Sequence, residues 1–415
     1  MRIPRTLRLA LLALFALSTV SWAGQYRRYG DKTTRIIIFR EGISSADRHR
    51  IAETYGAKVL RDLPFIDGVV VEIVVKPTRS GSSYRNSPAI EAEEDNSYRI
   101  WIQGMAAPGF DTMDPAGLGA QTRLVLEGAA AVRRRVTDNS SSARDGEIPW
   151  GIARVKASAV WSRTMGKGVK VGVIDTGIDS KHPDLAANYK GGVNIVDSSA
   201  DPMDDNGHGS HVAGTIAAVK DGKGVVGVAP EASLYAIKVL DADGGGTPDA
   251  IVDGLQWAAE HKLNVVNLSL GGTGTAALKR AVKAAYKAGV TIVAASGNDP
   301  KEPVSSPANY PESIAVSASS KVDGIAPFAS TGPEIAFIAP GVDIVSSAPG
   351  GGLAQHSGTS MASPHVAGLA ALAIALGAQG PAQVRAALEA AAVPLKGLSK
   401  DQQGAGMIEA DRLIR

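Results

Sequence analysis

Three short segments carry the residue types that nucleophilic catalysis by a hydroxyl group needs. Asp175 follows the run Val-Lys-Val-Gly-Val-Ile, His208 lies in Asn-Gly-His-Gly-Ser-His, and Ser360 lies in Ser-Gly-Thr-Ser-Met-Ala-Ser-Pro. A serine becomes a nucleophile when an imidazole accepts its proton, and a carboxylate fixes the tautomer of that imidazole and stabilises its charged form. Brought together, these residues would hydrolyse an acyl compound through an acyl-enzyme.

Each residue also has an ordinary structural interpretation. Taken alone, Asp175 fits a turn-forming aspartate and Ser360 fits a helix cap. His208 and His211 suggest a metal-binding pair, but metal-binding histidines on a helix usually lie four residues apart with a carboxylate nearby. We therefore expect His211 to be a packed, hydrogen-bonded histidine.

The three segments together resemble the signature motifs of the subtilase family. The matching stretches are Val-Ile-Asp-Thr-Gly, His-Gly-Ser-His-Val-Ala-Gly-Thr and Gly-Thr-Ser-Met-Ala-Ser-Pro-His-Val-Ala-Gly. Their order along the chain, Asp then His then Ser, also fits this family and differs from that of α/β-hydrolases. The resemblance covers residues 148–410 with short gaps. It implies a serine endopeptidase with Asp175 as the orienting acid, His208 as the general base and Ser360 as the nucleophile.

A fourth segment, Ala-Ala-Ser-Gly-Asn, ends at Asn298. In the family, an asparagine at this place donates a hydrogen bond to the oxyanion, together with the backbone N–H of the nucleophile. The chemistry needs such a donor because the carbonyl oxygen of the substrate becomes negative in the tetrahedral intermediate. Without its neighbours, Asn298 would be interpreted as a turn residue.

The resemblance also implies where protein and peptide substrates bind. The residues expected to pair with an extended substrate strand are Gly244, Gly245, Ser269, Leu270 and Gly271. Glycines there keep side chains away from the added strand. The small residues Ala295, Ser296 and Gly297 are expected to line a roomy pocket for the side chain before the cut bond. At its rim, Asp299 either favours basic side chains or is a solvated loop aspartate.

A structural calcium ion is the one cofactor that the resemblance implies, with none for catalysis. The expected ligands are the carboxylates of Asp184 and Asp221 and the backbone carbonyl groups of Val219, Lys223 and Val225. Oxygen ligands of this kind suit Ca²⁺. The amide ligand that the family usually supplies near the start of the domain is missing, because Gly146 falls near its place, and Asp145 or Glu147 is the alternative ligand there.

From residue 148 onward, apolar strands alternate with helices. The expected strands are Val169–Ile174, Leu234–Leu240, Val265–Leu270, Thr291–Ala295 and Ser313–Ser317. The expected helices are His208–Val219, Pro248–His261, Ala276–Ala288, Ser360–Leu376 and Pro381–Ala392. This pattern predicts an α/β fold whose mostly parallel sheet is covered by helices on both faces, as in subtilisin-like folds. Active sites in such folds lie at the carboxyl ends of the strands.

The residues before this domain divide into three segments. Residues 1–23, with a basic start, an apolar core and small residues at their end, are typical of a signal peptide. Residues 32–103 predict a small α+β unit with a final strand over 98–102. Its stretches Val-Val-Glu-Ile and Ala-Ile-Glu-Ala-Glu-Glu-Asp resemble subtilase inhibitory pro-segments. Residues 104–146 predict a linker that contains the maturation cut, and the peptidase domain is expected over 147–415.

This organisation predicts a self-processing zymogen that is secreted, with a periplasmic location left open. The pro-domain is expected to act as the enzyme's own inhibitor. The mature protein is expected to be a monomer without membrane contact once the signal peptide is removed.

Composition and local patterns weigh against other classes of function. The 415 residues carry 43 basic and 41 acidic side chains without a basic stripe, so we expect no nucleic-acid partner. The chain has no cysteine, which excludes disulfides and a thiolate nucleophile. A lipase-like hydrolase would carry the motif Gly-x-Ser-x-Gly around its nucleophile. Met361 and Ala362 follow Ser360, so this motif is absent there. A catalytically silent binding module is a third interpretation, although all four catalytic residue types are present.

Overall fold

A computed structural model describes residues 32–74, 87–96, 100–102 and 148–414. Its largest element is a nine-stranded sheet in the order β17-β18-β14-β13-β12-β10-β6-β8-β7, parallel except for β17. The strands are β6 Lys170–Asp175, β7 Tyr189–Asn194, β8 Ser233–Lys238, β10 Val265–Leu268, β12 Thr291–Ala295, β13 Ser313–Ser319, β14 Ile335–Pro340, β17 Ala392–Val393 and β18 Met407–Ile408. The predicted mostly parallel α/β fold is confirmed.

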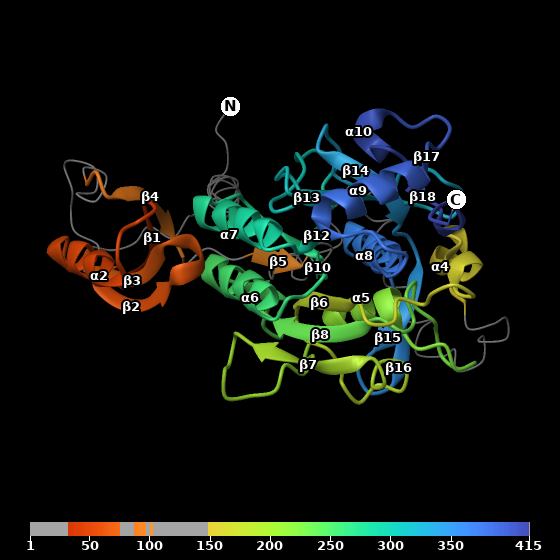
Figure 1. Cartoon of the computed structure of the whole chain (residues 1–415), viewed down its shortest axis with the longest axis horizontal. Coiled ribbons are helices and arrows are strands. Elements are labelled where there is room, and N and C mark those ends of the chain that lie inside the picture. The colour runs from red at the N-terminus through yellow and green to blue at the C-terminus, as the bar shows by residue number, and fades with distance from the viewer. Residues whose placement is uncertain (1–31, 75–86, 97–99, 103–147, 415) are drawn as a thin grey trace, which may run out of the picture.

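Helices cover both faces of this sheet because side chains alternate along its strands (Figure 1). On one face, Val171 and Val173 of β6 share a core with α5 and α8, and on the other Ile174 shares a core with α6 and α7. The helices are α4 Trp150–Arg154, α5 His208–Ala217, α6 Pro248–Glu260, α7 Ala276–Lys287, α8 Thr359–Ala375, α9 Gly380–Ala391 and α10 Lys400–Gln403, with single 3₁₀ turns at Ala157–Val160 and Ala410–Arg412. A two-stranded hairpin, β15 Ile344–Ala348 and β16 Gly352–His356, lies beside α5.

The N-terminal unit is an antiparallel sheet in the order β2-β3-β1-β4 with one helix. Its elements are β1 Lys32–Phe39, α2 Ser45–Thr54, β2 Lys58–Leu63, a 3₁₀ turn at Pro64–Ile66, β3 Gly68–Val74 and β4 Ile90–Asp95. One face of the sheet packs on α2 through Ile37 and Phe39. The other face, with Ile36 and Ile38, joins the core around α6 and α7. The N-terminal sheet is therefore buried partly against the larger unit.

The expected final strand of this small unit pairs elsewhere. β5, Ile100–Ile102, lies antiparallel between β9, Gly245–Gly246, and β11, Leu270–Gly271. It contributes nothing to the N-terminal sheet, so its expected place in that unit is wrong. β9 and β11 both contain glycine, which leaves room for a strand between them. The alternation of residue types along a strand does not indicate which sheet edge that strand will join.

The predicted strands and helices of the larger unit end within two residues of the observed ones. The sequence analysis did not predict β2, β7, β14, β17 or the hairpin of β15 and β16. The signal peptide over 1–23 and the linker over 104–146 lie outside the described residues. Among the described residues no single helix is long and apolar enough to cross a membrane; only α8 and α9 taken as a pair, bent by 107°, meet that length and composition.

Candidate active site

The first part of the site is a buried carboxylate–imidazole pair. Asp175 ends β6 and His208 begins α5. The Oδ1 atom of Asp175 accepts hydrogen bonds from His208 Nδ1 and from the backbone N–H of Thr176, each at 2.8 Å. With Nδ1 as the donor, His208 Nε2 is left as a proton acceptor. Among the described residues, that nitrogen is buried and has no hydrogen-bond partner.

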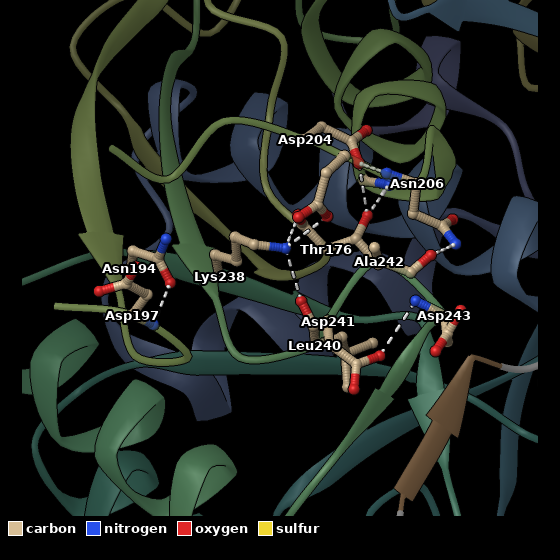
Figure 2. A network of polar contacts seen from close by, with 12 residues as sticks. Thr176, Asn194, Asp197, Asp204, Asn206, Lys238, Leu240, Asp241, Ala242 and Asp243 are labelled. Atoms are coloured by element: carbon tan, nitrogen blue, oxygen red, sulfur yellow. Dashed lines mark hydrogen bonds and ion pairs between the residues drawn. The ribbon is translucent and has the colours of Figure 1, made fainter. Parts of the chain in front are cut away.

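A polar network that includes Thr176, Asp204 and Lys238 links the loops next to this pair, and Figure 2 shows these three side chains. Asp204 accepts hydrogen bonds from Thr176 Oγ1 and from the backbone N–H of Ser210, both at 2.8 Å. Lys238 is only 3% exposed, and its Nζ donates to the carbonyl oxygens of Thr176 at 2.8 Å and Leu240 at 2.7 Å. Because these bonds join the loop after β6, the start of α5 and the end of β8, they fix the position of the imidazole.

The serine of the third motif lies in the first turn of α8, which packs against α5. Ser360 Oγ donates to the carbonyl oxygen of Ser269 at 3.1 Å, and Ser269 Oγ donates to the carbonyl oxygen of Ser360 at 2.8 Å. In the described structure, therefore, no hydrogen bond joins Ser360 Oγ to His208 Nε2. The start of α8 presents backbone N–H groups and the positive end of the helix dipole, which favours a developing negative charge.

The amide of Asn298 has a fixed orientation. Its Oδ1 atom accepts hydrogen bonds from the backbone N–H and the hydroxyl of Thr359, both at 2.9 Å. Its Nδ2 atom is buried without a hydrogen-bond partner among the described residues. A donor that is oriented in advance and unused is what an oxyanion site requires. Thr359, which sequence reasoning missed, is thus the residue that aims this donor.

The residues expected to bind an extended peptide lie on both sides of β5. Ile102 is in register with Leu270, and its backbone N–H donates to the carbonyl oxygen of Gly244 at 3.1 Å. The next position back along β5, residue 101, is in register with Gly245 on one side and Gly271 on the other. The two segments therefore form the walls of a strip that already contains a strand of this chain.

The expected side-chain pocket begins where β12 ends at Ala295. Ser296 and Gly297 follow and are buried. Gly297 has a φ of +122°, and a Cβ atom there would lie 2.8 Å from Ser305 Oγ and 2.7 Å from Ser330 Oγ. The position therefore requires glycine.

The expected calcium ligands lie near one another. Asp184 Oδ2 accepts from the backbone N–H of Val225 at 3.0 Å, and the carbonyl oxygen of Asp184 accepts from Val219 N at 2.8 Å. Asp221 Oδ1 accepts from the backbone N–H of Lys223 at 3.0 Å within the loop. In the described part of the chain no group of three or more His, Cys, Asp or Glu residues could hold a metal ion. The donor set, two carboxylates with backbone carbonyl groups, fits the oxygen chemistry of calcium.

Three other histidines lie near these motifs. His211 Nε2 donates to the carbonyl oxygen of Ile344 at 3.0 Å, which confirms the expected packed histidine. Burial, and then the neighbouring His356 and His208, hold the pKa of His211 well below its usual value. Burial lowers the pKa of His365 to about 4. His211 and His365 therefore stay neutral near neutral pH, and they add no positive charge beside the imidazole of the pair.

This geometry can be compared with known proteins. Residues 166–406 match the model of the subtilase family, Peptidase S8. The chain belongs to the subtilase family. It is 48% identical to subtilisin E of Bacillus subtilis (strain 168) over 256 residues, which are 60% of this chain and 67% of the relative. It is 45% identical to subtilisin BL of Lederbergia lenta over 274 residues, which are 65% of this chain and 99% of the relative. This subtilase is a subtilisin-type serine endopeptidase.

Sequence reasoning about this subtilase missed Thr359, and it missed one contact of Ser269, which it expected only to pair with substrate. Thr359 orients Asn298, and the carbonyl group of Ser269 holds the hydroxyl of Ser360. Thr359 stands next to the nucleophile in the third motif, so the motif itself contained that signal. The contact of the Ser269 carbonyl depends on how closely the residue between β10 and β11 approaches α8, which no local pattern contains.

Proposed function

We propose that this subtilase is a secreted, self-processing endopeptidase whose catalytic groups are Asp175, His208, Ser360 and Asn298. The observation that carries the proposal is the buried hydrogen bond from His208 Nδ1 to Asp175 Oδ1 at 2.8 Å, with Nε2 left unpaired among the described residues. An imidazole held in this way is a proton acceptor of fixed orientation. α5 packs against α8, and the proposed attack requires the hydroxyl of Ser360 to turn from the carbonyl oxygen of Ser269 towards His208 Nε2.

The proposed reaction has two halves. Ser360 Oγ attacks the carbonyl carbon of the substrate while His208 Nε2 takes the hydroxyl proton, and Asp175 stabilises the imidazolium. The negative oxygen of the tetrahedral intermediate accepts hydrogen bonds from Asn298 Nδ2 and from the backbone N–H of Ser360. The imidazolium then gives its proton to the leaving amine, which breaks the C–N bond. Water, activated by His208, hydrolyses the ester and restores the serine.

Substrates of the proposed enzyme are proteins and peptides bound as an extended strand. β5 supports this proposal because its backbone pairs with both β9 and β11, as a substrate strand would. A peptide in its place would use Gly244, Gly245 and Ser269–Gly271 as partners. The small pocket residues Ala295, Ser296 and Gly297 would admit the side chain before the cut bond.

The position of β5 also suggests where the precursor cuts itself. Ile102 is in register with Leu270, the residue after Ser269. The carbonyl oxygen of Ser269 accepts from Ser360 Oγ, so the nucleophile lies beside the residue that precedes Leu270. We infer that the maturation cut falls downstream of β5, within the linker over 104–146. Mass spectrometry of the released fragment tests this, and a fragment that ends before Ile102 would contradict the assignment.

Calcium is proposed as a structural ion. It would be held by the carboxylates of Asp184 and Asp221 and by the carbonyl groups of Val219, Lys223 and Val225. The ion would join the loop after α5 to the turn that contains Asp184, and it would take no part in the reaction. A monomer is proposed for the mature form, with the N-terminal unit as its inhibitor. The signal-like residues 1–23 support export, either to the medium or to a periplasm.

The test of this proposal compares the wild-type precursor with Ser360→Ala. We expect the wild type to process itself, to hydrolyse casein and to react with a serine-directed fluorophosphonate. Ser360→Ala should remain a full-length precursor on a gel, without casein hydrolysis or labelling. Hydrolysis of short-chain esters without casein cleavage would instead support a lipase-like hydrolase. A folded wild-type protein that neither labels nor hydrolyses would indicate a silent binding module.

A further inference from the structure

A cavity of about 490 Å³ lies where the N-terminal unit meets the start of α6. Its walls come from β7, from β9 and from the first two turns of α6, and Arg61 of β2 closes one side. The only charged residues among the described residues that line it are Arg61, Asp241, Asp249 and Asp253. Three carboxylates thus share the cavity with a single cation, which the N-terminal unit supplies.

The guanidinium of Arg61 is held by two carboxylates of α6. Its Nη1 atom lies 2.7 Å from Asp253 Oδ2, and its Nη2 atom contacts Asp249 Oδ2. The side chains of Asp249 and Asp253 are only 12% and 23% exposed. Burial, opposed by the charge of Arg61, raises the pKa of Asp253, and the charge of Asp249 raises it further. If Arg61 left, these two carboxylates, four positions apart on α6, would face each other without that counter-ion, which is unfavourable.

The cavity adjoins one end of the strip between β9 and β11, which β5 fills and where we propose that substrates bind; this strip is called the substrate strip. Gly245 and Gly246 line it, and Gly246 is in register with Ile100 of β5. Four residues before Ile100, the side chain of Asn96 accepts a hydrogen bond from the backbone N–H of Asp249 at 3.2 Å. The chain that fills the strip therefore also reaches the start of α6. A peptide in the same strip would bring its residues just before the Ile100 position near these carboxylates.

We propose that this acidic cavity is a subsite for a Lys or Arg side chain of the substrate, one to four residues upstream of the position that Ile100 occupies. This inference rests on the proposed function. Arg61 fills the subsite in the precursor and leaves it when the N-terminal unit is removed. The mature enzyme would then favour segments that carry a positive charge well upstream of the cut bond, whatever residue enters the pocket beside that bond.

The experiment uses the mature enzyme and fluorogenic peptides that share one sequence around the cut bond. Arg, Gln or Glu is placed in turn at each of the four upstream positions, and kcat/KM is measured at low salt and in 1 M NaCl. We expect Arg to exceed Gln by about fivefold at one or two positions, a size typical of a partly exposed ion pair. The ratio should fall towards one in 1 M NaCl because salt screens such charges. Equal rates for Arg and Gln at all four positions would overturn the proposal.

Three variants make the test specific. Asp253→Asn should reduce the Arg-to-Gln ratio, and Asp253→Lys should invert the preference so that Glu exceeds Gln. The matched control Glu260→Gln removes an exposed carboxylate from the same helix and should keep the wild-type ratio. A ratio unchanged in both Asp253 variants would overturn the subsite. Cleavage of the Gln peptides by wild type shows that the endopeptidase works, so failure of the subsite is distinguishable from failure of the proposed function.

Discussion

The site around Ser360 and the contact between the two units are built from different interactions. Asp175 and Ser360 are fully buried, and hydrogen bonds within the larger unit fix their surroundings. Arg61 and Arg280, which join the units, keep 38% and 18% of their side chains exposed. Buried polar groups are costly to disturb, whereas partly exposed ion pairs are weak and sensitive to salt. The difference supports the proposal that the N-terminal unit is released while the hydrogen bonds around Asp175 and Ser360 remain.

The contact between the two units also has an apolar part. The N-terminal sheet shares one face with α2, in a small core around Ile37, Phe39 and Ala52, and gives its other face to α6 and α7. Separation would expose Ile36 and Ile38 to water, which favours the docked state. The charged contacts at the rim therefore act together with a hydrophobic centre, as in other interfaces that form specifically and still dissociate.

The contact also satisfies the ends of two helices of the larger unit. Glu94 of β4 accepts hydrogen bonds from the backbone N–H groups of Ala276 and Ala277, the latter at 3.1 Å. Asn96 accepts from the N–H of Asp249 near the start of α6. A negative or polar group at a helix start satisfies free N–H groups and the helix dipole. The N-terminal unit therefore stabilises α6 and α7 in the place where they flank the substrate strip.

The largest effect should come from the buried side of this comparison. Asn298→Ala removes the donor that Thr359 orients, and we expect kcat to fall by about 10²–10³-fold with little change in KM. That magnitude is the one known for subtilisin, a relative of this chain, and it is borrowed from it. Steady-state kinetics with one peptide substrate measure the effect. A fall of less than threefold, with the thermal midpoint unchanged, would show that Asn298 does not contact the oxyanion.

A smaller effect should come from the contact between the units. Arg280 on α7 donates to the carbonyl oxygen of Phe39 at 2.9 Å and to Asp67 Oδ2 at 2.9 Å, and it pairs with Glu91 at 3.2 Å. Arg280→Ala should weaken inhibition by the cleaved N-terminal fragment about tenfold, because three contacts are lost at a partly buried position. The inhibition constant is measured with fragment recovered from the processed wild-type precursor.

The exposed Lys283 on the same helix supplies the control for this prediction. Lys283→Ala removes a positive charge without breaking those three contacts, so the inhibition constant should stay at the wild-type value. Equal weakening in both variants would show that the overall charge of α7, rather than the specific contacts of Arg280, holds the fragment. The charged contacts at the rim would then act by general electrostatic attraction instead of by specific pairing.

The smallest effect concerns the larger unit alone. A calcium chelator should lower the thermal midpoint of the mature enzyme by about 5–10 °C, because an ion that binds only the folded state stabilises it. Asp221→Asn should lower the midpoint in the presence of calcium and respond less to the chelator. Calorimetry or circular dichroism measures the shift. An unchanged thermal midpoint of the wild type in the presence of the chelator would show that calcium does not stabilise this unit.

Much of the site could be predicted from the sequence because its residues lie in short, contiguous motifs. The runs that end at Asp175 and at Ala295 are apolar strands, and parallel strands bring their carboxyl ends to one edge of the sheet. Glycine at position 207 and at position 358 precedes helices that carry His208 and Ser360 in their first turns. Local chemistry therefore determined the family and the α/β class, and it supplied the residues that we propose as catalytic.

Tertiary structure alone decided which distant segments meet. β5 joins β9 and β11 instead of its own unit, and Arg61 reaches Asp249 across 188 positions of sequence. Such pairings depend on which edges and charges remain open once the two cores have formed, and no local period of hydrophobic residues encodes that. The sequence by itself thus determined what reaction the enzyme catalyses. The folded arrangement decided that the strand β5 of its N-terminal segment lies between β9 and β11, where we propose that substrates bind.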